Sequence, residues 1–569
     1  MVLFKSPHPH LSIPDRLTTW QWAFEDKEFS PTEYASPRNV GGYINAVTKE
    51  RLDLFEVKTK ATQLSTALIR HYGLQAGDTV SLFSTNTIWY PIAMWATVRA
   101  GGRVNGASPA YNAEEMAYAL KTAESKFLFT LPTSLKVAME AAESVGLPKK
   151  HIFLLEGRHP DFLSLDDLLA LGSKYTTEPA WAIPPGKSNK DVCGYLNFSS
   201  GTTGLPKAVM LSHHNIIAQC HQLRQVQVVE PSQRYRILAV MPLFHITGLV
   251  RFCHYSVFMN GDSIMLPAFT MDGMLQAIIN YKVDELILVP PILIRIVRDS
   301  VVDKYMDQLQ PIIKRWSSGS APIAPEIIAL LQKKFPNTGF RQGYGATEST
   351  ACISCHPPSH YDYKYAATGG MLCANTVGKI MSLDPVPREL GVGEVGELWA
   401  KGPQIAMGYM NNEKATKESF DDEGFLHTGD IGHIDSDGLI RIEDRIKEMI
   451  KVKGQQVAPA ELEDFLLGQD AVEDCAVLGI SDSYAGERPK AYIVLKDSVT
   501  PSEEVGRALM KAVQDKKVRY KWLAELEFTN SIPKSPTGKL LRRVLKASER
   551  EKGRVTGLIV KDQKERARL

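Results

Sequence analysis

Short apolar segments alternate with amphipathic stretches along the first part of the chain. The apolar segments 79–83, 126–129, 151–155, 236–240 and 286–289 each have the length of a buried strand, and helical periodicity separates them. Strands that are apolar on both faces and are joined by helices are typical of parallel sheets covered by helices. The pattern therefore predicts a large N-terminal α/β domain with parallel sheets.

The pattern changes from about residue 378 to residue 441, where short strand-like segments are separated by glycines. This region predicts a small β-rich unit at the end of the large domain. Beyond it, residues 459–468 read as a capped helix, and residues 477–480 and 491–495 read as strands.

These segments predict a small, mobile α+β domain at the C-terminus. We therefore divide the chain into a large domain, residues 1–446, and a C-terminal domain, residues 447–569.

The most informative polar segment is residues 199–207, Ser-Ser-Gly-Thr-Thr-Gly-Leu-Pro-Lys. Its glycines allow positive φ, so that backbone N–H groups can converge on an anion, and its hydroxyls and lysine add further donors. Residues 192–198 predict a strand before it, and Ser212 is the predicted N-cap of a helix that begins at His213. Strand, polar loop and helix form the layout of a phosphate site, although the common P-loop pattern is absent. A flexible turn is the alternative.

Composition narrows the class of protein. A chain of 569 residues is too long to fold around one hydrophobic core. Its content of 44% hydrophobic and 23% charged residues is ordinary for a soluble globular protein. A net charge of +2 gives no argument for nucleic acid as a partner. No apolar run approaches the roughly 20 residues that cross a bilayer, and the N-terminus lacks a secretory pattern. We therefore expect a soluble intracellular protein without a membrane span.

The C-terminal region carries a local excess of positive charge. A solvated helix face is the favoured interpretation, and a patch that attracts an anionic nucleotide or coenzyme A is the alternative. The basic residues are Lys534, Lys539, Arg542, Arg543, Lys546, Arg550, Lys552 and Arg554. The last three residues, Ala567-Arg568-Leu569, are similar to the Ser-Lys-Leu peroxisomal signal, which predicts import by the peroxisomal receptor; the cytoplasm is the alternative location.

Other polar segments carry some chemistry but are weak signals alone. Residues 242–248 place His245 after an apolar strand, where a packed histidine is the common alternative to a catalytic one. Residues 342–348 combine an aromatic ring, a hydroxyl and a carboxylate, which suit a base, a phosphate and a hard cation. Asp430 follows a glycine and suits ribose hydroxyls, and Lys539 follows another glycine near the C-terminus.

The order of these segments resembles the adenylate-forming superfamily of acyl-CoA synthetases, luciferases and adenylation domains, and most of all the 4-coumarate–CoA-ligase-like enzymes. The resemblance covers nearly the whole chain. It rests on the segments SSGTTGLPKAVMLSHHN, PLFHITGL, GYGATE, GELWAKGPQIAMGYM, HTGD, DRIKEMIKVKGQQVAPAELE and PKSPTGKLLRR, which occur in the order of the family.

The resemblance implies an acid–CoA ligase of secondary metabolism. Such enzymes use ATP and Mg²⁺ to convert a carboxylic acid into an acyl adenylate and pyrophosphate, and then transfer the acyl group to coenzyme A. The acid expected here is an aryl acid or a medium-chain or branched fatty acid. An adenylating enzyme with another acceptor, a carrier protein or oxygen, is one alternative, and a non-catalytic nucleotide-binding or acyl-binding protein is another.

The resemblance also implies roles for individual residues. The residues matching the ATP and AMP site are Ser199, Ser200, Gly201, Thr202, Thr203, Lys207, Ser320, Gln342, Gly343, Tyr344, Thr347, Asp430, Arg445 and Lys539. Those matching catalytic or hinge positions are Lys539, His245, Thr347, Lys447, Lys451 and Gln456. Lys453 and Gly454 match coenzyme A contacts; His245, Thr247 and Gly343 match the acyl pocket; and Glu348 matches the Mg²⁺ ligand.

Two positions depart from the pattern of the family. Ala268 stands where relatives usually carry Lys or Arg near the nucleotide end of coenzyme A. Thr247 stands where hydroxycinnamate-specific relatives tend to have a tyrosine against the substrate ring. The first departure changes the expected affinity or binding mode of coenzyme A, and the second argues for an acid other than coumarate.

Overall fold

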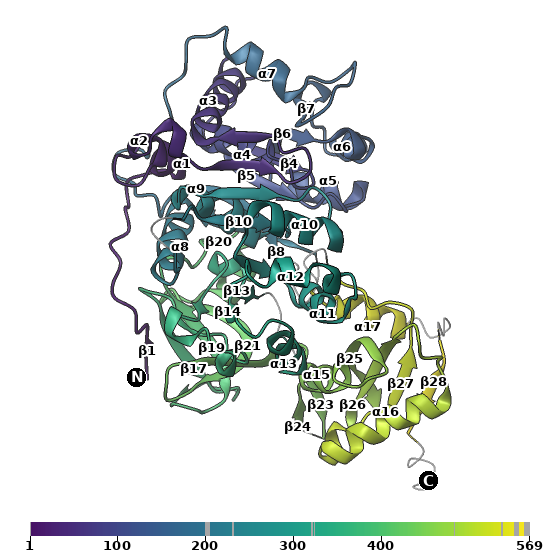
Figure 1. Cartoon of the computed structure of the whole chain (residues 1–569). Helices are drawn as coiled ribbons and strands as arrows, with labels where there is room; N and C mark the ends of the chain where they lie inside the picture. Colours follow the sequence, from purple (N-terminus) through teal and green to yellow (C-terminus); the bar gives the residue numbers. More distant parts are fainter. Residues whose placement is uncertain are drawn as a thin grey trace.

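The structure is a computed structural model of the whole chain. It describes residues 2–199, 205–229, 233–319, 323, 325–453, 455–482, 484–535, 539–550 and 557–562. A large body built from the N-terminal part carries a smaller C-terminal lobe on one side (Figure 1). None of the described helices combines the length and apolar character that a bilayer crossing requires.

The first sheet of the large body has the strand order β20-β9-β8-β5-β4-β6-β7. Strands β8, β5, β4, β6 and β7 run parallel, which confirms the predicted parallel α/β arrangement. The bounds are β4 (Thr79–Phe83), β5 (Arg103–Ala107), β6 (Ser125–Thr130), β7 (Ile152–Leu154), β8 (Cys193–Ser199), β9 (Lys207–Ser212) and β20 (Gly408–Tyr409).

The prediction that the polar loop leads directly into a helix is wrong. Residues 207–212 form β9, which runs antiparallel to β8 with Lys207 opposite Ser199. Strand β9 covers what would otherwise be an exposed edge of the parallel sheet, so the loop connects a hairpin. Helix α8 (His213–Gln225) then begins where predicted, and the Ser212 side chain accepts the backbone N–H of Asn215.

Two further sheets complete the α/β part. One has the order β10-β11-β2-β3 and the other β12-β13-β14-β15-β16, and their first three strands run parallel. The bounds are β2 (Gly42–Asn45), β3 (Arg51–Asp53), β10 (Arg236–Ala239), β11 (Asp262–Met265), β12 (Glu285–Leu288), β13 (Arg315–Ser318), β14 (Gly339–Tyr344), β15 (Ser354–Cys355) and β16 (Met371–Leu372).

Helices cover these sheets (Figure 1). Their bounds are α1 (Thr19–Phe24), α2 (Pro31–Tyr34), α3 (Leu54–Arg70), α4 (Tyr90–Arg99), α5 (Ala113–Thr122), α6 (Leu135–Ser144), α7 (Leu165–Gly172), a π-helical segment Gly248–Tyr255, α9 (Ser256–Phe258), α10 (Met271–Tyr281), α11 (Pro290–Arg298), α12 (Met306–Leu309), α13 (Pro325–Lys334) and α14 (Glu413–Ser419).

The β-rich unit predicted for residues 378–441 is present as a sheet with the order β1-β17-β19-β21-β22, to which β18 adds at β17. Its N-terminal strand, β1 (Phe4–Lys5), comes from the other end of the chain, and Figure 1 shows it beside β17. The other bounds are β17 (Val377–Met381), β18 (Glu389–Leu390), β19 (Gly396–Lys401), β21 (Leu426–Ile434) and β22 (Ile440–Arg445).

The C-terminal lobe is an α+β unit with its own apolar core. Its sheet has the order β24-β23-β26-β27-β28, with β25 paired to β26, and the predicted strands are parts of the longer β25 and β26. The predicted helix is present, but it begins at Pro459 without a side-chain cap from Ala458. The bounds are β23 (Ile450–Val452), β24 (Gln455–Val457), α15 (Pro459–Leu467), β25 (Val472–Asp482), β26 (Gly486–Leu495), α16 (Glu503–Lys516), β27 (Glu525–Phe528), α17 (Arg542–Arg550) and β28 (Ile559–Lys561).

Arg298, at the end of α11, attaches the C-terminal lobe to the large body. Its guanidinium donates to the carbonyl oxygens of Leu467 at 2.9 Å, Val472 at 3.2 Å and Glu473 at 3.1 Å. It also lies 3.5 Å from the carboxylate of Glu473. Hydrogen bonds from a charged donor are stronger than neutral ones, so this contact holds the lobe in the position seen here.

We expect Arg298→Ala to loosen this docking. Loss of charge-assisted hydrogen bonds, worth about 1.5–3 kcal/mol, shifts the docking equilibrium about 10- to 100-fold. Limited proteolysis between β22 and β23 should become faster, and the radius of gyration measured by small-angle scattering should increase. Arg295→Ala is the matched control, because Arg295 pairs with Asp299 and lies over the ring of Phe269, both in the large body. Equal proteolysis of the two variants would contradict this role.

Candidate active site

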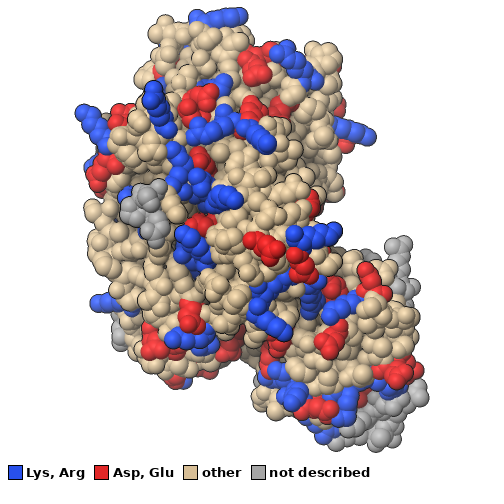
Figure 2. Space-filling view, viewed as in Figure 1, with Lys and Arg blue, Asp and Glu red and all other residues tan. Residues whose placement is uncertain are grey.

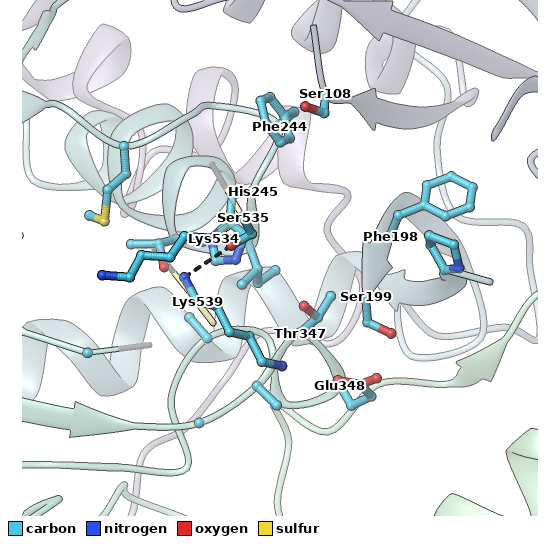
Figure 3. A pocket seen from close by; sticks show the side chains of 18 of the residues that line it. Ser108, Phe198, Ser199, Phe244, His245, Thr347, Glu348, Lys534, Ser535 and Lys539 are labelled. Carbon is cyan, nitrogen blue, oxygen red and sulfur yellow. Dashed lines mark hydrogen bonds between the residues drawn. The ribbon is translucent and has the colours of Figure 1, made fainter. Parts of the chain in front are cut away.

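A cavity of about 640 Å³ lies between the large body and the C-terminal lobe. Its wall in the large body includes residues at the carboxyl ends of β8, β12, β13 and β14, where open parallel sheets commonly bind ligands. The lobe contributes the residues Lys534, Ser535, Lys539, Leu541 and Arg543. Figure 3 shows Lys539 reaching into the cavity, with His245 on one side and Glu348 on the other.

Lys539 brings a positive charge from the lobe into this cavity. Its backbone N–H donates to Ser535 Oγ at 3.1 Å, which fixes the chain on which the side chain extends (Figure 3). Burial, followed by the positive charge of Arg445, lowers the pKa of Lys539 to about 8, while Glu448 and Asp430 act in the opposite direction. The group is therefore largely protonated at neutral pH but loses its charge at a lower pH than an exposed lysine does.

His245 lies beside Lys539 as an uncharged ring. Burial, followed by the charge of Lys539, lowers the pKa of His245 to about 4. Its Nδ1 accepts a hydrogen bond from the backbone N–H of Thr247 at 3.3 Å. An uncharged imidazole adds no repulsion to a cation beside it, so Lys539 and His245 can occupy the same cavity.

Buried Asp430 and half-buried Arg445 form an ion pair across the hairpin of β21 and β22. They are opposite each other in the register, and Arg445 Nε lies 3.1 Å from Asp430 Oδ1. The hydroxyl of Tyr344 on β14 donates to Asp430 Oδ2 at 2.7 Å. Burial raises the pKa of Asp430, and the Arg445 charge opposes this shift. The sequence predicted these residues separately, and the fold brings them together behind the cavity wall that Arg445 lines.

Glu348 is held by a residue that the sequence analysis did not identify. The hydroxyl of Tyr409 on β20 donates to Glu348 Oε1 at 2.9 Å, and Lys207 Nζ lies 4.6 Å from the centre of the same ring. Glu348 and Ser199 both line the cavity, and Figure 3 shows them near each other. Tyr409 lies within the segment GELWAKGPQIAMGYM, which matches the family. That match does not reveal the hydrogen bond from Tyr409 to Glu348.

The predicted acyl-pocket residues His245, Thr247 and Gly343 all line the cavity, as does Thr347. Gln342 faces away from it on β14, and its Oε1 is buried without a partner in the described part of the chain. Sequence reasoning did not identify the lining residues Arg251 and Arg341, which are treated below.

Several predicted residues are not at the cavity. Lys447 is exposed in the turn after β22, and Lys451, Lys453 and Gln456 are exposed on the hairpin of β23 and β24. Figure 1 shows this hairpin at the far end of the lobe from α17. The predicted residues that lie outside the described residues are Ser200, Gly201, Thr202, Thr203, Ser320 and Gly454.

The interpretation of the basic tail as a solvated face is wrong for part of that tail. Lys534 and Arg543 line the cavity, and Arg542 is buried in ion pairs with Glu448 and Glu463. Lys534 and Arg543 therefore lie where the lobe meets the large body, although Arg543 is also exposed to solvent, and Arg542 is paired within the lobe. On the face shown in Figure 2, basic and acidic side chains are interspersed over both parts of the molecule.

Comparison with known proteins gives the family. The model of the AMP-binding enzyme family matches residues 41–410, and the model of the AMP-binding enzyme C-terminal domain matches residues 461–539. The chain belongs to the AMP-binding enzyme family. The predicted enzyme class, an AMP-forming acid–thiol ligase, is confirmed with it.

Curated relatives of similar length support this membership of the AMP-binding enzyme family. The chain is 34% identical to the peroxisomal OPC-8:0-CoA ligase 1 of Arabidopsis thaliana, over 88% of this chain and 89% of the relative. It is also 34% identical to the 4-coumarate–CoA ligase-like 1 of the same plant, over 96% of each. The expected ATP-dependent acid–CoA ligation agrees with these relatives.

Solved structures of AMP-binding enzymes have the same fold. ATP-bound MatB from Rhodopseudomonas palustris superposes with a TM-score of 0.81 at 23% identity and covers 94% of this chain and 99% of its own. The anthranilate CoA ligase AuaEII in complex with anthranoyl-AMP superposes with a TM-score of 0.80 at 22% identity, covering 95% and 98%. The predicted fold class is thereby confirmed.

We expect Arg445→Ala to destabilise the large domain by about 1–3 kcal/mol, because it leaves the Asp430 carboxylate buried without its counter-charge. The double variant Arg445→Ala/Asp430→Asn should recover most of this loss, since the asparagine carries no charge. Removing Arg445 raises the pKa of Asp430 further, so the loss is fully present above that pKa and shrinks as the pH falls through it. Thermal unfolding across a pH series measures both effects; a loss independent of pH would contradict the assignment.

Proposed function

We propose that the cavity between the large domain, residues 1–446, and the C-terminal domain, residues 447–569, is where the acid is joined to AMP. The observation that carries this proposal is the position of Lys539, which the C-terminal domain places in the same cavity as His245, Glu348 and Arg445. The proposed boundary falls in the turn between β22 and β23.

In the first step, the carboxylate of the acid attacks the α-phosphorus of ATP and pyrophosphate leaves. The carboxylate is itself the nucleophile, so positioning and electrostatics supply the catalysis. Lys539 would hold the carboxylate and the α-phosphate together and offset the charge that develops between them. Asp430 and Arg445 would bind the ribose, and Tyr344 would pack against adenine with Gln342, Gly343, Thr347 and Ser320 nearby.

The hairpin of β8 and β9 would hold the pyrophosphate end of ATP. Ser199 ends one strand and Lys207 begins the other, and the seven residues between them include Ser200, Gly201, Thr202 and Thr203. Lys207 supplies a positive charge at the base of this loop, and glycines allow backbone donors to approach the phosphates.

Glu348 is the residue that fits Mg²⁺. The described residues contain no group of three or more His, Cys, Asp or Glu side chains that could hold a metal ion by themselves. Mg²⁺ is usually held by one or two carboxylates together with substrate phosphates, and this agrees with a single Glu348 at the phosphate side of the cavity. The ion would supply neutralisation of phosphate charge, while Tyr409 orients the carboxylate through its hydrogen bond.

In the second step, the thiol of coenzyme A attacks the acyl carbon of the adenylate, so that a thioester forms, AMP leaves and the thiol proton passes to solvent. A rotation of the C-terminal domain about Lys447 would move Lys539 out of the cavity and bring the β23–β24 hairpin to it. The exposure of Lys451, Lys453 and Gln456 on this hairpin supports the rotation. After this rotation Lys453 and Gly454 would contact coenzyme A. The docking contact of Arg298 uses mainly backbone carbonyls, which separate without leaving a buried side-chain charge on the lobe.

We infer that the acid is an aryl acid or a medium-chain or branched fatty acid rather than coumarate, because Thr247 lines the cavity in place of a tyrosine. A test of the whole function is pyrophosphate release across a panel of such acids, with and without coenzyme A. Acid-dependent pyrophosphate and a thioester are expected. Pyrophosphate without any thioester would indicate another acceptor, and no acid-dependent pyrophosphate would favour a non-catalytic binding protein.

We also propose that Ala567-Arg568-Leu569 directs the protein to peroxisomes. The support is the similarity of this tripeptide to the known signal and the name of one relative, the peroxisomal OPC-8:0-CoA ligase 1 of Arabidopsis thaliana. Deletion of the tripeptide should move a fluorescent fusion to the cytoplasm, and an unchanged location would exclude this signal.

We expect Lys539→Ala to lower acid-dependent pyrophosphate release about 10²- to 10³-fold, because the donor that faces the developing charge is removed. Thioester formation from a supplied acyl adenylate should be retained, since the second step does not use this side chain. Lys561→Ala is the matched control: this lysine of the same domain is exposed and pairs with Glu525. Equal loss in both half-reactions would contradict the division of roles.

We expect kcat/KM for ATP to fall above about pH 8, because the free enzyme then loses the proton of Lys539. The profile of kcat should decline at higher pH, since bound phosphates favour the charged lysine and raise its pKa. Initial rates of pyrophosphate release from pH 6 to about pH 10 measure both profiles. Lys539→Arg keeps its charge throughout this range, so an unchanged decline in that variant would assign the titration to another group.

A further inference from the structure

Two buried arginines line the part of the cavity away from Lys539. Arg251, in the π-helical segment after His245, is 5% exposed, and Arg341 on β14 is 1% exposed. Each has a guanidinium nitrogen that is buried without a hydrogen-bond partner in the described part of the chain: Nη1 of Arg251 and Nη2 of Arg341. Both residues also line the cavity. Buried polar groups are nearly always paired, so these two nitrogens call for an explanation.

Arg251 lies among aromatic and thiol side chains. Its guanidinium carbon lies 5.4 Å from the centre of the Tyr255 ring. A hydrogen bond with Cys373, together with the charges of Arg341 and Arg251, lowers the pKa of the Cys355 thiol to about 6. Within the described residues, Arg251 forms no ion pair with any carboxylate; Arg341 and Arg315 pair with the same one, Glu285. Cation–π contact offsets only part of the cost of burying a guanidinium.

The shared Glu285 does not balance the charge of this region. It is 3% exposed and lies 3.0 Å from Arg315 and 3.4 Å from Arg341. One carboxylate thus faces two guanidiniums, and Arg251 adds a third positive charge. Buried guanidinium nitrogens without hydrogen-bond partners are unfavourable, so Arg251 and Arg341 favour an anionic acceptor in the cavity that they line.

This basic region lies at the inner end of the cavity. Arg341 and Gly343 are two residues apart on β14 and therefore point to the same face of the strand. Arg341 precedes Gly343, which places it about 6–7 Å further from the carboxyl end of the strand. Lys539 enters the cavity from the C-terminal lobe, whereas Arg341 and Arg251 belong to β14 and the π-helical segment of the large body. The two positive centres thus lie at different ends of one cavity.

We propose that the acid activated by this protein carries a second carboxylate at the end remote from the reacting one. This proposal rests on the proposed function, because it assigns the reacting carboxylate to Lys539 and the far carboxylate to Arg251 and Arg341. The far carboxylate accepts hydrogen bonds from the two unpartnered guanidinium nitrogens and balances the charge that Glu285 leaves. The planar guanidinium matches the geometry of a carboxylate, which favours this group over a neutral acceptor.

The test compares matched pairs of acids with wild-type protein. Each α,ω-dicarboxylic acid, from succinate to dodecanedioate, and terephthalate as the aryl case, is paired with the monocarboxylic acid of the same skeleton and with an oxo acid of the same length. We expect one diacid to have a kcat/KM about 10- to 100-fold above that of its matched monoacid. A higher kcat/KM for the monoacid or for the oxo acid across the whole panel would overturn the proposal.

Variants then assign the preference to Arg251. Arg251→Met should lower the diacid-to-monoacid ratio about 10- to 100-fold, mainly through KM, while Arg251→Lys retains part of the preference because it keeps the charge. Arg224→Met is the matched control: Arg224 also lies over an aromatic ring, 5.0 Å from that of Phe258, but it is exposed and does not line the cavity. A ratio unchanged by Arg251→Met would overturn the proposal.

Thermal stability separates substrate recognition from a structural role. Without ligand, Arg251→Met should unfold at the same or a higher temperature than the wild type, since it removes a buried charge that lacks an anion. A lower unfolding temperature together with an unchanged acid preference would show that Arg251 is structural. If neither diacids nor monoacids give pyrophosphate with the wild type, the proposed function itself is wrong. If pyrophosphate forms but diacids are not preferred, only the diacid proposal is wrong.

Discussion

The placement of one buried ammonium group, Lys539, connects the two parts of this protein. The large domain provides the cavity and the C-terminal domain provides the charge, so neither part contains the complete site. Burial lowers the pKa of Lys539. This decrease in pKa is limited because Asp430, Glu348 and Glu448 lie close enough to favour the charged form. The active arrangement therefore depends on the docking of the small domain as much as on the residues that line the cavity.

The docking surface includes polar contacts that suit the proposed rotation. Arg298 of the large body binds backbone carbonyls of the lobe. Hydrogen bonds of this kind are exchanged for water at modest cost, whereas a large apolar surface would hold the domains together permanently. The lobe also has its own apolar core, so it can move as a rigid unit.

The sequence predicts the elements that have a local signal. The parallel strands, the Ser212 cap of α8 and the two-domain order follow from apolar periodicity and capping, which depend on neighbouring residues. Strand β9 was missed because its polar ends resemble a loop and its pairing depends on the free edge of β8. The contact of Tyr409 with Glu348 and the burial of Arg251 join segments far apart in the chain, and no local pattern contains that information. The family resemblance identified the residues proposed for the reacting end, because the family is defined by the formation of an adenylate.

The two ends of the cavity are built in different ways, and the difference has a physical reason. At the end proposed to hold the reacting carboxylate, Lys539 comes from a domain that docks through polar contacts, so the proposed rotation would withdraw its charge after the first step. At the inner end, Arg341 lies on a central strand between β13 and β15 and Arg251 on a buried helical segment, so neither can withdraw. Recognition of the acid must persist through both steps, since the acyl group stays bound while the acceptor changes. A fixed charge at the inner end and a removable one at the reacting end satisfy both requirements in a single cavity.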